Sequence, residues 1–429
     1  MRHWHSDVAS FQRDQLRFFL DKACTHPGPI VRLNLGFQRI WQVTDPDWVR
    51  TCLKGEDDTV DKGRFIRKLE PIVGSSTLTL NGDENARRRN AMHKAFAKGA
   101  AKSLVAEVSA TLTHASVELL RLGEFEALDF SAPLALRLFC IALFGKDVLS
   151  RGDETLVVNA VRSVERDIAK ELFRVLPESP WSARARHSRN ATARKMMTYV
   201  VNNVRGRASD SSVLSALASL GLNDRELADE LITLLIAGHH TTGPAAAWIM
   251  YHLANYPEVA ARLRSEANAL ALDGIEFTSK SLESAHTAQS FVREVLRLYP
   301  SAHWFSRDAR KEIKIGDQII RKGEALIFCP WQLHRDPRYW SAPQNFDIDR
   351  SFSNKAFMPF GVGARACIGM SIAMLNLQLI ALHFASAFTL SLTNPAQNAD
   401  PTGLVVLTPP TIRLRAVPSE MNSILQAAE

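Results

Sequence analysis

One short segment, residues 360–369, constrains the fold more than any other part of the chain. It reads Phe-Gly-Val-Gly-Ala-Arg-Ala-Cys-Ile-Gly, and an apolar run with helical spacing follows it at residues 370–384. Cys367 is therefore expected where a glycine-containing turn meets the start of a helix. Free N–H groups and the dipole at a helix start favour a thiolate, and Arg365 adds positive charge. The glycines allow sharp turns and the close approach of a flat group, so the segment predicts a metal ligand or a nucleophile.

This segment resembles the haem-ligand loop of the cytochrome P450 monooxygenases, whose pattern is Phe-x-x-Gly-x-Arg-x-Cys-x-Gly. Phe360, Gly363, Arg365, Cys367 and Gly369 occupy all of its fixed positions. The resemblance implies that the cysteine thiolate is the axial ligand of haem b, iron protoporphyrin IX. It also implies that the other matching residues surround this cofactor, with the arginine directed at a haem propionate. The alternative is a buried free cysteine without a ligand, which is common for this residue type.

The resemblance extends over residues 30–415 and implies a single, mainly α domain with small β-sheets. A chain of 429 residues that is 46% hydrophobic can bury a core of that size. One cytochrome P450 domain is expected over residues 1–429, with residues 1–29 as a peripheral N-terminal segment and haem between an oxygen-binding helix and the cysteine-ligand helix. Apolar spacing predicts further helices at 8–24, 45–53, 103–123, 131–145, 153–176, 183–205, 257–271 and 282–298, and strands at 31–35, 40–43, 313–315, 319–320 and 325–328.

The cysteine pattern and the polar start of the chain indicate a cytoplasmic protein. The five cysteines show no CxxC spacing, which argues against a disulfide framework or structural zinc. The first residues contain no apolar run long enough for a signal peptide or a membrane anchor. The formal net charge of +7 is modest, so it favours an acidic protein partner, and nothing else in the sequence indicates nucleic-acid binding.

The longest helical pattern covers residues 223–256. Asn223 and Glu226 have the spacing of a capping box. In the middle of the pattern, Ala237 and Gly238 have almost no side chain, so a flat cofactor or dioxygen can approach the backbone there. The resemblance implies that this helix is the oxygen-binding helix, with both small residues against the haem.

The same helix carries the residues expected to handle oxygen and protons. Its sequence resembles the family pattern Ala/Gly-Gly-x-Asp/Glu-Thr, and Thr241 matches the threonine that hydrogen-bonds bound oxygen. His240 stands where the family has a carboxylate, so it is a candidate proton relay; transfer through His239 and a purely structural role are the alternatives. Pro244 removes a backbone donor, and we expect the helix to open locally there.

A basic run at residues 81–102 resembles the helix that contacts a haem propionate. In that motif a His or Trp is followed four residues later by Arg or His, one helical turn away on the same face. Arg89 matches the second position, and Asn85 replaces the aromatic residue at the first. The rest are expected to be a solvated face or a docking face for an acidic electron carrier; the basic residues of the run are Arg87, Arg88, Arg89, His93, Lys94, Lys98 and Lys102.

A second group of motifs lies between the two helices of the expected haem site. Glu294 and Arg297 are three residues apart on one helical face and resemble the family's Glu-x-x-Arg motif. Arg350 matches its third member, so we expect a buried structural clamp behind the haem. Arg307 matches a propionate-binding arginine in its distance from Pro300 and offers bidentate donors to a carboxylate.

The sequence also suggests what the pocket accepts. His303 and Trp304 are expected to face it together with Ala237, and their bulk suggests an apolar small-molecule substrate. The resemblance then implies an enzyme that inserts one oxygen atom of dioxygen, using electrons from a separate ferredoxin or flavodoxin and its reductase. A hydrogen-peroxide-driven peroxygenase or an atypical oxidation or rearrangement is an alternative, prompted by His240. A non-catalytic haem-binding sensor is an alternative of another class.

Overall fold

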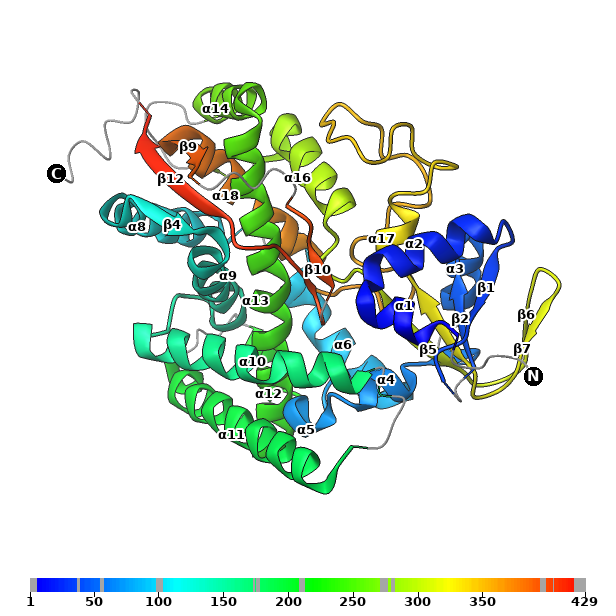
Figure 1. Ribbon diagram of the computed structural model, residues 1–429. Coiled ribbons are helices and arrows are strands. Elements are labelled where there is room, and N and C mark those ends of the chain that lie inside the picture. The colour runs from blue at the N-terminus through cyan, green and yellow to red at the C-terminus, as the bar shows by residue number, and fades with distance from the viewer. Residues whose placement is uncertain are drawn as a thin grey trace.

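The fold is mainly helical with small sheets, as predicted, and the long helix α13 (Asp224–Asn255) passes through its centre (Figure 1). This computed structural model describes residues 6–36, 39–54, 58–97, 103–172, 174, 178–207, 213–270, 277–278, 282–393, 399–403 and 405–419.

The other helices lie close to the ranges that apolar spacing predicts. The exceptions are four short helices that no predicted range covers: α4 and α5, in a region where periodicity fades along the sequence, and α12 and α17. The range 8–24 forms two helices, α1 and α2, instead of one. The helices are α1 (Val8–Arg13), α2 (Gln15–Thr25), α3 (Pro46–Lys54), α4 (Gly63–Arg67), α5 (Glu70–Val73), α6 (Gly82–Phe96), α8 (Val105–Leu122), α9 (Ala127–Phe144), α10 (Arg151–Leu172), α11 (Pro180–Val204), α12 (Val213–Ala218), α14 (Pro257–Leu270), α16 (His286–Leu298), α17 (Pro330–Leu333) and α18 (Met370–Ala387).

The strands form four small sheets within the described part of the chain. The largest has the order β1-β2-β8-β5-β3, in which β2 and β8 run parallel and the other pairs are antiparallel. The others pair β4-β12-β9, β6-β7 and β10-β11. The strands are β1 (Ile30–Leu33), β2 (Ile40–Val43), β3 (Val60–Asp61), β4 (Glu124–Glu126), β5 (Phe305–Ala309), β6 (Ile313–Ile315), β7 (Gln318–Ile320), β8 (Ala325–Phe328), β9 (Phe388–Leu392), β10 (Thr402–Gly403), β11 (Leu407–Thr408) and β12 (Arg413–Pro418).

Helix α13 begins with the capping box that the sequence predicts, formed by Asn223 and Glu226. The expected local opening at Pro244 is wrong, because the helix continues through the proline without interruption. Most of its residues after the first turn are buried, so packing against α9 and α18 holds the helical path. One side-chain bond supports this contact: the Ser131 hydroxyl on α9 donates to the Gly243 carbonyl at 2.8 Å.

The N-terminal helices pack against the five-stranded sheet. Phe11, Phe18 and Phe19 are buried in a cluster with apolar residues of β1, β2 and β8. Their rings meet edge to face, with centroids 5.4–5.9 Å apart, a geometry that adds to the gain from burial. The segment that we expected to be peripheral thus contributes core residues.

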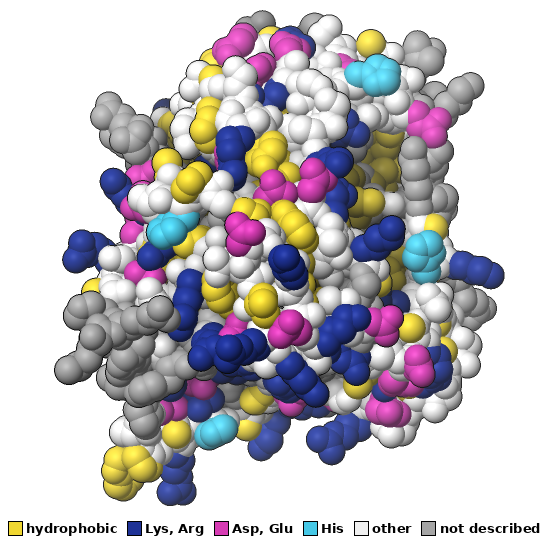
Figure 2. All heavy atoms as spheres, turned by 90° about the vertical axis from the view of Figure 1, so that its right-hand side faces the viewer, with side chains coloured by type: hydrophobic (Ala, Val, Ile, Leu, Met, Phe, Trp, Pro, Cys, Tyr) yellow, Lys and Arg dark blue, Asp and Glu magenta, His cyan; other side chains and the backbone are white. Residues whose placement is uncertain are grey.

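Among the residues that the structure describes, two helices, α9 and α18, are long and apolar enough to cross a membrane by length and composition. Each has most of its residues buried within the protein, 72% and 61% respectively. They are therefore the core helices that flank α13. Figure 2 shows that the face bearing the N-terminal helices and sheets mixes Lys and Arg with Asp and Glu side chains.

Candidate active site between α13 and the cysteine loop

A cavity of about 330 Å³ lies at the centre of the fold, within the range of roughly 300–1,000 Å³ typical of ligand sites. Residues of α13 line it, and so do those of the loop at residues 359–369. Further walls come from α4, α6, α9, α16, α18 and β5. The two sequence motifs that predict a cofactor site therefore contribute to one cavity.

The cysteine loop turns sharply before α18. Gly361 and Gly363 have positive φ angles of 67° and 82°, which glycine adopts without strain. A Cβ on Gly363 would lie 2.5 Å from the Leu53 carbonyl oxygen, so a larger residue does not fit there. The Cys367 N–H donates to the Phe360 carbonyl at 2.8 Å, and Cys367 lines the cavity.

Burial governs the protonation of Cys367. Its side chain is open to the cavity but surrounded by protein, and this burial raises the pKa of the thiol above its ordinary value. The Gly369 N–H and the positive charge of Arg89 oppose that rise. Sequence reasoning expected Arg365 to supply this charge, whereas Arg89 is the cation that acts on the sulfur. A coordinating metal ion deprotonates a thiol outright, so the thiolate depends on the metal more than on the helix start.

The motif on α13, residues 237–241, contributes small and hydroxyl-bearing residues to the cavity. Ala237, Gly238 and Thr241 all line the cavity, and the Thr241 hydroxyl donates to the Ala237 carbonyl at 2.8 Å. A Cβ on Gly238 would lie 2.2 Å from Cγ of the Phe139 ring. Any larger residue at position 238 would therefore clash with Phe139 on helix α9. The close packing of α9, and not only the space needed in the cavity, explains the glycine.

Cationic side chains lie at the cavity wall. Arg307 on β5, Arg365 on the cysteine loop and Lys62 line it. Arg89 on α6 approaches the same loop, donating from Nη2 to the Ala366 carbonyl at 2.7 Å. Sequence reasoning missed Lys62, because no periodicity or motif marks the segment that contains it.

These residues fit a haem group. The cavity combines a sulfur donor with apolar walls and with guanidinium and ammonium groups, which match an iron atom, a flat macrocycle and two anionic propionates respectively. Cys367 would hold the iron, and Arg307, Arg365 and Lys62 are placed to pair with the carboxylates.

Asn85 has a different role from the propionate contact that was expected. It is buried, and its amide Nδ2 donates to the carbonyls of Thr77 and Leu80 at 2.6 and 3.0 Å. A propionate needs hydrogen-bond donors, and both amide hydrogens are already used. The structure therefore assigns Asn85 to holding the segment before α6.

The structure also corrects the expected orientation of the residues around β5. His303 and Trp304 do not line the cavity, whereas Ala302 and Phe305 do. His303 is fully buried, and this burial lowers its pKa to about 3, so it is neutral. Trp304 instead packs edge to face on Phe65, with ring centroids 6.0 Å apart. Neither residue is placed to orient a substrate.

His240 turns away from the cavity and faces helix α10. Its Nε2 lies 3.4 Å from Oε1 of Glu165, and their side chains are only 16% and 13% exposed. The His239 Nδ1–H donates to the Leu235 carbonyl at 2.6 Å, and burial lowers the pKa of this histidine to about 4. A neutral His239 keeps one ring proton, which this hydrogen bond uses, and burial opposes the gain of a second one. Both features disfavour the alternative proton route through it.

The structure brings the three clamp residues together. Glu294 and Arg297 form a fully buried bidentate pair with two contacts of 2.7 Å. Arg350 donates to the same carboxylate at 3.2 Å, and the Asp347 N–H does so at 3.0 Å. Arg297 also donates to backbone carbonyls of the segment that leads toward the cysteine loop, those of His334, Pro343 and Asn345.

The basic run divides into two environments. Arg88 was grouped with a solvated face, but it is only 1% exposed, which corrects that expectation. His93 and Lys94 are exposed on α6. Lys98 and Lys102 lie outside the described residues.

A helical fold with a cavity cysteine facing a helix of small residues and threonine defines a haem-thiolate protein. The cytochrome P450 family model matches residues 7–416, and the chain belongs to the cytochrome P450 family. It is a monooxygenase of that family, and haem is its cofactor.

Individual relatives are distant. The chain is 26% identical over 386 residues to cyclooctat-9-en-7-ol 5-monooxygenase of Streptomyces melanosporofaciens, covering 85% of this chain and 83% of that protein. It is 25% identical over 465 residues to a probable cytochrome P450 4s3 of Drosophila melanogaster, covering 97% and 90%. The crystal structure of the cytochrome P450DA heme domain superposes with a TM-score of 0.83 at 21% identity, covering 96% of this chain and 95% of that one.

Proposed function

We propose that this enzyme inserts one oxygen atom from dioxygen into an apolar small molecule, with electrons from a separate redox protein. The observation that carries the proposal is that Cys367 and Thr241 line the same cavity. The walls on the α13 side are apolar apart from hydroxyl groups, with Leu234, Ala237 and Ala245 among them. Such walls bind uncharged substrates, because a charge would be desolvated there without a partner.

The chain's own residues position and protect the reaction. Haem, when bound, supplies the reductive activation of dioxygen and the oxidation of carbon. Cys367 would hold the metal, and Arg307 and Arg365 would pair with the carboxylates of the cofactor. The small side chain of Ala237 would leave room for a flat cofactor in the cavity. The Thr241 hydroxyl, which donates to the Ala237 carbonyl, would accept a hydrogen bond from a group bound there.

We propose a ferredoxin or flavodoxin, with its reductase, as the electron donor. The exposed basic residues His93 and Lys94 lie on α6, and the same helix contacts the cysteine loop through Arg89. An acidic carrier docked there would lie close to the metal ligand, and charge complementarity speeds such encounters. All five cysteines are unpaired, which supports a reducing, cytoplasmic compartment.

Isotope labelling tests the reaction type. A ligand that changes the spin state of the haem iron is first selected by absorbance and used as substrate. We expect ferredoxin and its reductase to support NAD(P)H consumption with heavy oxygen from labelled dioxygen appearing in the product. Product formation at low hydrogen peroxide concentration, with none from the redox partners, would instead establish the peroxygenase alternative that His240 suggests.

We also propose that Glu165 supplies the carboxylate that α13 lacks at position 240. Glu165 lies on α10 and faces His240, and its Oε1 is buried without a hydrogen bond in the described structure. A histidine side chain can pass a proton between its two ring nitrogens. Thr241, the residue after His240, lines the cavity, so the pair lies one residue along α13 from the site where protons would be consumed.

Exchanging the two charges tests this pair. His240→Asp places two carboxylates face to face, and we expect product formed per NAD(P)H to fall by about tenfold. Adding Glu165→Lys restores an acid on α13 with a cation on α10, and coupling is expected to recover in the double variant. Unchanged coupling in the single variant, or no recovery in the double variant, contradicts a proton-handling role.

A further inference from the structure

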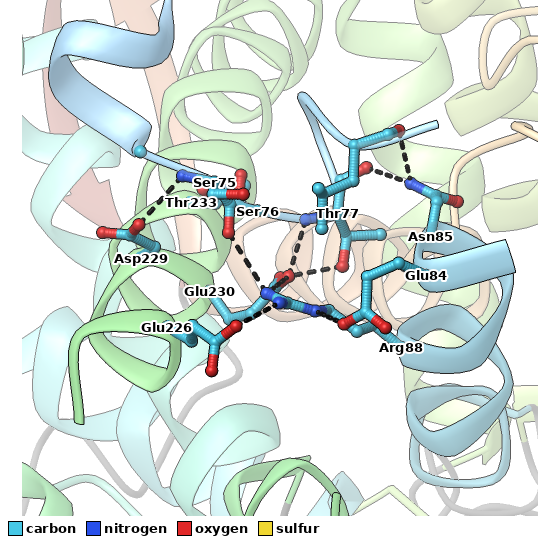
Figure 3. A network of polar contacts seen from close by, with 12 residues as sticks. Ser75, Ser76, Thr77, Glu84, Asn85, Arg88, Glu226, Asp229, Glu230 and Thr233 are labelled. Atoms are coloured by element: carbon cyan, nitrogen blue, oxygen red, sulfur yellow. Dashed lines mark hydrogen bonds and ion pairs between the residues drawn. The ribbon is translucent and has the colours of Figure 1, made fainter. Parts of the chain in front are cut away.

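A cluster of ionic contacts outside the cofactor walls centres on the buried side chain of Arg88. This residue on α6 meets three carboxylates, one from its own helix and two from α13 (Figure 3). Arg88 lies 2.6 Å from Glu84, 3.2 Å from Glu226 and 3.0 Å from Glu230. Glu84 and Glu226 are partly exposed, at 38% and 37%, whereas Glu230 is completely buried. Only the Arg88–Glu230 contact is therefore shielded from water on both sides.

Glu230 has a second partner besides the arginine. Its Oε1 accepts the Thr77 N–H at 2.6 Å, and its Oε2 accepts the Thr77 hydroxyl at 2.8 Å (Figure 3). The guanidinium of Arg88 also donates to the Ser75 carbonyl at 3.1 Å. Both members of the ion pair thus hold the same segment, residues 74–80, which connects α5 to α6.

Segment 74–80 also contributes to the cavity wall. Leu78 lines the cavity, one residue after the threonine that Glu230 binds. The Thr77 carbonyl accepts from Lys62 Nζ at 3.0 Å, and the Leu80 carbonyl accepts from Arg365 Nη1 at 3.4 Å. Lys62 and Arg365 both line the cavity. One short segment therefore orients an apolar wall residue and two cations.

We propose that the Arg88–Glu230 pair is a positioning device that sets segment 74–80 and, through it, the wall of the substrate cavity. Neither residue lines the cavity, so both act through Leu78, Lys62 and Arg365. The pair has a desolvation cost that only close hydrogen bonding offsets, and such fixed contacts hold a site in its productive geometry. The inference rests on the proposed haem-dependent function of the cavity.

Two azoles that ligate haem iron test the device in the holoenzyme. The affinity of imidazole reports on access to the iron. The larger 4-phenylimidazole must also fit against the cavity wall that includes Leu78, so its affinity reports on the position of that wall as well. Glu230→Gln keeps the shape and one acceptor but removes the buried counter-charge of Arg88. We expect the Kd of 4-phenylimidazole to rise about tenfold while that of imidazole changes by less than about twofold. The rate of haem transfer to an excess of apomyoglobin is expected to increase, because Lys62 and Arg365 lose their carbonyl partners.

Matched variants separate positioning from general stability. Glu84→Gln neutralises a partner of the same arginine that does not touch Thr77, so both Kd values are expected to stay within about twofold of wild type. Thr77→Val removes only the hydroxyl donor to Glu230, and we expect it to raise the Kd of 4-phenylimidazole by a smaller factor. If Glu230→Gln does not fold, the Kd values of Thr77→Val test the proposal instead.

Two outcomes would overturn the proposal in different ways. If the variants at Glu230 and Thr77 lower the melting temperature but leave the ratio of the two Kd values unchanged, the pair only stabilises the fold. If the iron of the wild-type holoenzyme binds neither azole, the open haem site of the proposed function fails, and the inference fails with it.

Discussion

Replacing Cys367 with serine is expected to abolish the spectral signature of the haem-thiolate site. The reduced wild-type holoprotein exposed to carbon monoxide should give the strongly red-shifted Soret absorption of an anionic sulfur donor, and Cys367→Ser should not. Serine has nearly the same size, so the cavity keeps its shape while the soft, electron-rich ligand is lost. Product formation should fall more than about 100-fold, because even residues that only support a metal ligand cost about 10–100-fold.

A matched substitution shows whether the effect belongs to this thiol. Cys24→Ser changes an exposed cysteine on α2, and it should leave the spectrum and the turnover unchanged. Haem content is measured for each variant by pyridine haemochrome, so that loss of cofactor is distinguished from loss of thiolate ligation. A Cys367→Ser protein that binds haem and keeps the red-shifted band would contradict the ligand assignment.

The parts of the site that the sequence predicts are those encoded by local spacing. The glycines around Cys367 and the small residues beside Thr241 determine backbone path and free volume within one turn or one helix, so their placement follows from neighbouring residues. Glu294 and Arg297 share a helical face by their spacing alone. The long apolar helices are equally readable, which is why the helical class of the fold is confirmed.

The parts that it does not predict depend on contacts between distant segments. Arg88 is buried because α13 supplies Glu230, which lies 142 residues away in the chain, and no local pattern reveals that partner. His303 and Trp304 directly precede a strand, where successive side chains point to opposite sides. An error of one residue in the predicted position therefore decides whether a side chain is assigned to the cavity wall or to the core. Lys62 lies in a segment without periodicity, so only the tertiary structure places it at the cavity.

Neutralising Glu294 is expected to produce the largest loss of stability among these variants. The carboxylate forms a bidentate pair with Arg297, and both side chains are 0% exposed. Glu294→Gln leaves the guanidinium buried without its principal counter-charge, and breaking a buried pair by changing one partner costs about 3–5 kcal/mol. That is a large share of the roughly 5–15 kcal/mol that holds a typical domain folded. We therefore expect a much lower yield of holoprotein and a lower urea midpoint of unfolding.

A surface pair of the same geometry provides the control. Arg262 and Asp349 also form a bidentate contact, at 2.8 and 2.9 Å, but both side chains are substantially exposed. Asp349→Asn should shift the urea midpoint little, because water screens the exposed pair. The difference between the shifts in urea midpoint of the two variants then reports the effect of burying the ion pair, because both variants lose a charge pair. Equally small shifts in the urea midpoint of both variants would contradict a clamp formed by Glu294 and Arg297. The packing of residues 334–350 alone would then determine the path of the segment that leads to the cysteine loop.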